Sequence, residues 1–113
     1  MNPPRLSPVT EGTRWPSGDS IDLAVLPMTE GELATRIGLP LTRGVEDGWG
    51  AWSAVGGRLP SGLDVEFVCY ASKPGSVVLR TDKNASYSAA LDEALQLVGL
   101  SRPQVLVSPL ANG

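Results

Sequence analysis

The clearest pattern along the chain is an alternation of apolar and polar positions over residues 63–71. Every second residue there is apolar, whereas Asp64 and Glu66 stand between the apolar positions. A period of two is typical of a β-strand with one buried face. A Pro-Ser-Gly turn before it and a Lys-Pro-Gly turn after it separate this strand from extended segments at 49–59 and 77–81. The pattern therefore predicts an antiparallel meander of three strands.

Two other segments repeat apolar residues at helical spacing. The first, 30–37, follows Thr29, which with Glu32 has the spacing of a capping box, and a glycine comes directly after it. The second, 87–98, places apolar residues three and four apart and ends before Gly99. The spacing predicts two helices that pack on the sheet.

The remaining segments complete a predicted α+β fold. Residues 21–26 suit either a short strand or one helical turn, 44–50 suit a loop, and 105–107 suit a strand or edge segment. Residues 1–20 are rich in Pro, Ser, Thr and Gly and predict an irregular arm. We expect residues 21–113 to form one domain in the order α-β-β-β-α-β. Its sheet would be a three-stranded antiparallel meander with a possible fourth strand, and both helices would pack on it.

Composition narrows the chemistry that this chain can perform. It has 113 residues, a net charge of −3, no histidine and one cysteine. The lack of histidine excludes Ser-His-Asp and Cys-His nucleophiles and His-ligated metals, and one cysteine excludes disulfide frameworks and thiolate zinc sites. Cys69 falls on the apolar face of the alternating strand, where burial raises a thiol pKa. We expect no catalytic residues, no metal site and no cofactor.

The same counts bear on location and on nucleic acids. The longest apolar stretch, Leu23–Met28, is six residues long, which is too short for a secretion signal or a membrane span. We therefore expect a cytoplasmic protein that does not bind membranes. The acidic balance argues against binding to a phosphate backbone. Residues 32–43 resemble the first helix and turn of a helix-turn-helix DNA reader, but glycines and the acids Glu46 and Asp47 follow where a basic recognition helix is required.

A mixed acidic and aromatic surface is the strongest candidate for function. Asp64, Glu66 and Tyr70 share the outer face of the alternating strand, and such a mixture suits a protein interface. A solvated sheet face is the simplest alternative, and a site in which Asp64, Glu66 and Asp82 act as catalytic or ligand-binding carboxylates is another. The predicted partner-binding residues are Asp64, Glu66, Tyr70, Trp49, Glu46 and Asp47.

The order of elements from Trp49 to Leu100 resembles that of known small proteins. An extended segment, an acidic strand, an apolar strand and a helix follow one another, as in the small acidic α+β immunity proteins that neutralise polymorphic bacterial toxins. The order is also similar to that of acidic secretion chaperones. Both resemblances imply a non-enzymatic inhibitor or escort that binds a partner protein, and a basic toxin or effector is the candidate partner. A homodimer through an edge at 105–107 stays open, as does a small ligand-binding domain or enzyme.

Overall fold

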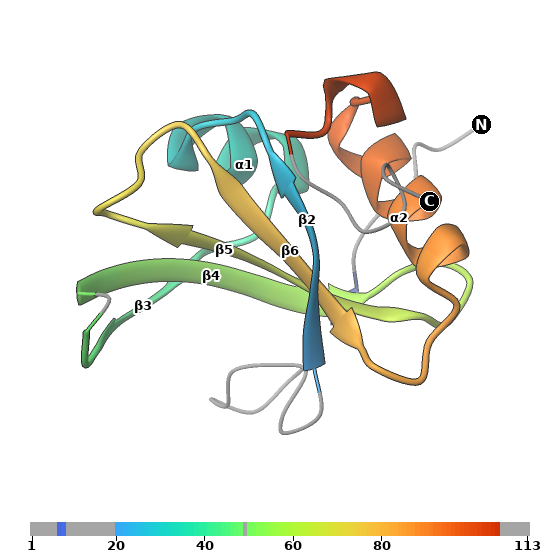
Figure 1. Cartoon of the computed structure of the whole chain (residues 1–113), viewed down its shortest axis with the longest axis horizontal. Coiled ribbons are helices and arrows are strands. Elements are labelled where there is room, and N and C mark those ends of the chain that lie inside the picture. Colours follow the sequence, from blue (N-terminus) through green and yellow to red (C-terminus); the bar gives the residue numbers. More distant parts are fainter. Residues whose placement is uncertain (1–6, 9–19, 49, 107–113) are drawn as a thin grey trace.

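One antiparallel sheet runs through the described residues, which are 7–8, 20–48 and 50–106 of this computed structural model (Figure 1). Its strands are β1 (Ser7–Pro8), β2 (Ser20–Leu26), β3 (Thr42–Glu46), β4 (Gly50–Arg58), β5 (Asp64–Tyr70) and β6 (Val77–Asp82). The order across the sheet is β1-β4-β5-β6-β2, and β3 pairs with β4 beside this path. The helices are α1 (Glu30–Ile37), α2 (Tyr87–Val98) and a short 3-10 helix, η1 (Arg102–Gln104). The fold is α+β.

The predicted three-stranded meander with a possible fourth strand is wrong in its extent. The meander exists as β4, β5 and β6, but β2 and β3 extend it on either side. Residues 20–26 are a strand that pairs with β6, with a register shift between Asp22 and Ala24. This pairing joins segments that lie far apart in the sequence, so a local pattern of seven residues cannot reveal it.

The predicted loop at 44–50 is also wrong, since the strand β3 occupies its first half. Glycine lowers strand propensity, and Gly44 and Gly48 therefore favoured a loop. In the structure, a Cβ atom added to Gly44 would lie 2.3 Å from Cζ2 of Trp52 on the neighbouring strand. The indole thus occupies the space that any other side chain at 44 would need, and this glycine belongs to a strand.

Both predicted helices are confirmed at their expected bounds. The capping box of α1 is formed, because the Glu32 N–H donates to Thr29 Oγ1 and the Thr29 N–H donates to Glu32 Oε1, each at 3.1 Å. Gly38 ends the helix in the left-handed region with φ of 74°. The apolar stripe of α2 is buried against the sheet at Leu91, Leu95 and three further positions.

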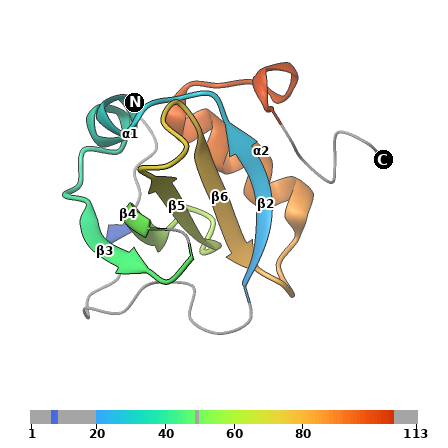
Figure 2. The ribbon, with the colours of Figure 1, turned by 60° about the vertical axis from the view of Figure 1, so that its left-hand side comes forward.

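The helices cover one face of the sheet and leave a smaller apolar cluster on the other (Figures 1 and 2). Phe67, Leu79 and Leu33 are fully buried on the helix-covered face. Val68, Tyr70 and Ala54 form the second cluster with the partly buried Trp52 and Val78. The side chains of β5 therefore contribute to both faces, which is why β5 is buried along nearly its whole length.

The two ends of the chain fall only partly within the described residues. The expected arm at 1–20 lies outside them except for Ser20 and for Ser7–Pro8, which pair with Arg58 and Gly57. At the other end the Leu106 N–H donates to the Val25 carbonyl oxygen at 2.8 Å, so the segment after η1 contacts the edge of β2. Residue 107 of the predicted edge segment lies outside. No helix in the described ranges is long and apolar enough to cross a membrane.

Candidate functional site

Asp64 lies at the start of β5 in a cross-strand ion pair. It is directly opposite Arg58 of β4, and Arg58 Nε donates to Asp64 Oδ1 at 2.8 Å. The hydrogen bond and the negative charge of Asp64 raise the pKa of Arg58. Because the Arg58 side chain is 61% exposed, this pair is a surface feature that contributes little to stability.

Glu66 and Tyr70 lie beneath the surface, where they contact Arg80 of β6. The carboxylate of Glu66 is 3.6 Å from Arg80 Nη1, and Arg80 Nη2 donates to the Tyr70 hydroxyl at 3.0 Å. Arg80 Nε also donates to Asp22 of β2 at 2.7 Å. We call these four residues the Arg80 cluster; it ties three strands together. Since Glu66 is only 2% exposed, it acts within the chain and orients Arg80.

The other predicted binding residues belong to the hairpin between β3 and β4. Glu46 pairs with Gly50 at the end of the two strands, and Asp47 is exposed in the turn beside Gly48, whose φ is 84°. Trp49 lies outside the described residues. Asp64 is at the opposite end of β5 from this hairpin, so the predicted residues do not converge on one patch.

The carboxylates of the alternative enzyme or ligand site lie on one face of β5 and β6, but no group of three acidic, His or Cys side chains in the described residues is placed to hold a metal ion. Asp64 pairs with Arg58 and Glu66 with Arg80, as described above. Asp82 instead accepts a hydrogen bond from the Asn84 N–H at 2.8 Å in the turn before α2. Each of the three carboxylates therefore has a different partner within the chain.

A surface that the sequence analysis missed runs along β3. Val45 is 80% exposed, which is unusual for a large apolar residue. It stands opposite Ala51 of β4, and the Ala71 N–H donates to the Ala51 carbonyl oxygen at 2.9 Å. Residues that oppose each other share a face, so these three exposed side chains form a row across the sheet beyond α1. We call it the apolar row.

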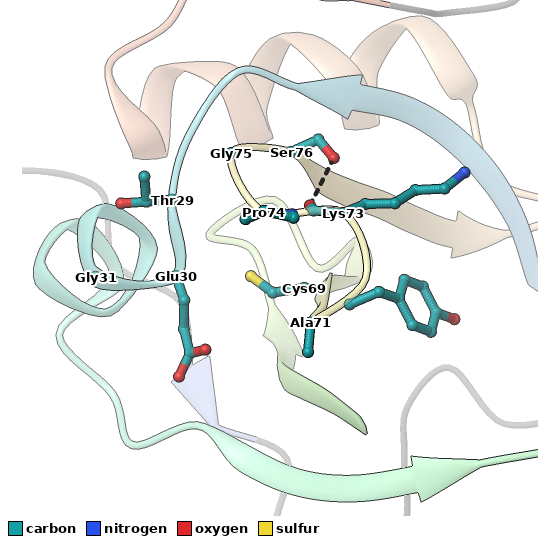
Figure 3. Close-up of a pocket in the computed structure, with 10 residues that line it drawn as sticks. Thr29, Glu30, Gly31, Cys69, Ala71, Lys73, Pro74, Gly75 and Ser76 are labelled. Atoms are coloured by element: carbon teal, nitrogen blue, oxygen red, sulfur yellow. Dashed lines mark hydrogen bonds between the residues drawn. The ribbon is translucent and has the colours of Figure 1, made fainter. Parts of the chain in front are cut away.

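The apolar row ends at a cavity of about 280 Å³ beside the first turn of α1 (Figure 3). Ala71 belongs to both, and Cys69 lies between α1 and the turn that joins β5 to β6. Burial raises the pKa of the Cys69 thiol to about 11, and the negative charge of Glu30 adds to the effect. The residues around the cavity are Thr29, Glu30, Gly31, Cys69, Tyr70, Ala71, Lys73, Pro74, Gly75 and Ser76.

The raised pKa of Cys69 predicts slow reaction with iodoacetamide. Since the thiol pKa rises from 9.0 to about 11, the fraction of Cys69 present as thiolate at pH 8 falls ~100-fold. A more basic thiolate is also more nucleophilic, which recovers about 10-fold of the lost reaction rate. We expect alkylation of the folded chain to be about 10-fold slower than that of the urea-unfolded chain. Mass spectrometry across pH 7–11 measures this, because the chain has one cysteine. A rate that levels off near pH 9 would show an ordinary thiol.

A hairpin signal in the sequence was available for β3. The dipeptide Asp47-Gly48, directly after Thr42–Glu46, is typical of hairpin turns. The same strand stands where the helix-turn-helix resemblance requires a recognition helix, so that geometry is not present. The comparisons with family models, with curated proteins and with solved structures gave no match to this chain.

Proposed function

We propose that this chain is a non-enzymatic protein-binding domain that neutralises or escorts a partner protein. An immunity protein that inhibits a bacterial toxin is the first form of this proposal, and a secretion-chaperone-like escort is the second. The absence of histidine and the raised pKa of the single cysteine thiol support a role without nucleophilic catalysis.

The observation that carries the proposal is the exposed surface formed by β3 and the apolar row. Val45, Ala51 and Ala71 are exposed side by side, and contiguous exposed apolar residues are a feature of interaction sites. Two charged residues flank Val45: Arg43 lies within β3, and Asp47 lies in the turn that follows this strand. An apolar centre with charges at its rim is the usual composition of a protein interface.

One ion pair and one hydrogen bond of Arg43 support this location. Arg43 Nη2 is 2.6 Å from Glu30 Oε1 and its Nη1 donates to Ser53 Oγ at 3.1 Å. These contacts fix the guanidinium against α1 and balance its charge. Asp47, which is exposed in the hairpin turn, then adds a negative charge at this end of β3, which suits a basic group on a partner.

The test compares two matched substitutions of exposed apolar residues. Partners would be isolated from native cells with three tagged proteins: the wild-type chain, Val45→Lys and Leu106→Lys. The recovered partner would then be purified, and its binding to each of the three would be measured by calorimetric titration. We expect a 1:1 complex that Val45→Lys weakens at least 10-fold, whereas Leu106→Lys, at a residue 57% exposed elsewhere, leaves it unchanged. If the partner loses its activity in the complex, this chain is an inhibitor. If the partner keeps its activity, this chain is an escort.

Two results would contradict the proposal. If the tagged chain recovers no stoichiometric partner from native cells, the proposed binding role is wrong. A partner that binds Val45→Lys and Leu106→Lys as tightly as the wild-type chain does not use this surface.

A further inference from the structure

We infer that the partner contributes an extended segment, apolar at its centre and basic at one end, which adds to the sheet as a strand beside β3. This inference rests on the proposed function and specifies how the surface is used. Main-chain hydrogen bonds would supply affinity, and the side chains around Val45 would supply selectivity.

The outer side of β3 has the groups that such pairing requires. In the described part of the chain, β3 pairs with β4 on one side and with no strand on the other. In an antiparallel pair, alternate residues direct their N–H and C=O groups away from the partner strand. Thr42–Glu46 therefore presents a row of main-chain donors and acceptors at the sheet edge.

The other edges of the sheet carry a proline, a register shift or an occupied main-chain acceptor, which β3 lacks among the described residues. The β2 edge has a register shift between Asp22 and Ala24, and the Leu106 N–H already donates to Val25 on that strand. The short strand β1 contains Pro8, which has no N–H to donate. By contrast, β3 has no proline and pairs with β4 in one uninterrupted register. The main-chain groups on the outer side of β3 are therefore in a regular register that an added strand could use.

The charges beside β3 select the chemistry of the incoming segment. Arg43 forms an ion pair with Glu30 at one end, whereas Asp47 is exposed at the hairpin end. A lysine or arginine on the segment would lie near Asp47, and a branched apolar residue would cover Val45. A second copy of this chain fits less well, because antiparallel pairing centred on Gly44 would place Arg43 against Val45 of the other copy.

The experiment selects ten-residue peptides from a random displayed library on the wild-type chain and discards those that also bind Val45→Lys. A selected peptide is then synthesised, and amide hydrogen exchange of the chain is measured by NMR with and without it. We expect alternating apolar and basic residues in the peptide and added protection at alternate amides of 42–46. We expect an analogue methylated on its central main-chain nitrogens to bind at least 10-fold more weakly, and Leu106→Lys to bind the peptide normally.

The outcomes separate this inference from the proposed function. Peptides that bind through Val45 without protecting alternate β3 amides, or that tolerate N-methylation, would overturn strand addition while the binding role stands. Concentration-dependent dimers that protect these amides without peptide would identify a second copy as the occupant and overturn the partner segment. If no peptide is selected while a purified cellular partner still requires Val45, strand addition by a linear segment is also wrong. If neither peptide nor cellular partner is found, both proposals fail.

Discussion

The substitution Arg80→Met will lower the free energy of unfolding by about 3 kcal/mol. Methionine keeps much of the apolar length of the side chain but removes the guanidinium beside Glu66, whose carboxylate is 2% exposed. Removing one member of a buried ion pair leaves the other charge in a medium that solvates it poorly, which costs about 3–5 kcal/mol in proteins. Urea unfolding followed by circular dichroism measures the change.

Two further variants isolate the cause of this loss. Arg80→Met combined with Glu66→Gln will recover part of the stability, because the buried carboxylate is replaced by an uncharged amide. Arg58→Met, at the surface pair with Asp64, will cost less than about 1 kcal/mol, since Arg58 is 61% exposed. If Arg80→Met and Arg58→Met lower stability equally, or if Glu66→Gln gives no recovery, the Arg80 cluster does not act through a buried charge.

The elements with complete local signals were predicted nearly residue for residue. The capping box and terminal glycine bound α1 at Glu30–Ile37, and the strict alternation defined β5. These signals work because a cap or an alternating face depends on residues within one turn or one strand. The predicted burial of Cys69 and its raised pKa followed from the same alternation and are confirmed.

The missing strands depend on contacts that no short window contains. β2 takes its place beside β6 through pairs such as Asp22 with Arg80, which are 58 residues apart. The sequence placed Glu66 and Tyr70 together on the face opposite Phe67, but their contacts with Arg80 depend on the pairing of β5 with β6. The apolar row was missed because it exists only once β3, β4 and the residue after β5 are in register. The apolar row could therefore be found only from the tertiary structure.

The substitution Gly44→Ala will destabilise the chain by about 2–3 kcal/mol, although one methyl group is added at a partly exposed strand position. The new Cβ would lie 2.3 Å from Cζ2 and 2.7 Å from Cε2 of Trp52, so the indole must move. That movement disturbs its packing against Ala54, Val68 and Tyr70. Overpacking of this kind costs about 1–3 kcal/mol, and loss of aromatic packing adds to it. Urea unfolding followed by circular dichroism measures the difference.

Two comparisons determine whether the indole is responsible. Gly31→Ala, in the first turn of α1, has its nearest neighbour at 3.9 Å and will leave stability unchanged or raise it by about 0.5 kcal/mol. In a Trp52→Leu background, Gly44→Ala will cost less than about 1 kcal/mol, because the ring that occupies the space is gone. Equal costs of Gly44→Ala in the two backgrounds would show that glycine is needed for its backbone alone. A smaller cost in the leucine background identifies Trp52 as the reason that a strand with a central glycine forms here, and this strand is the edge on which the proposed interface depends.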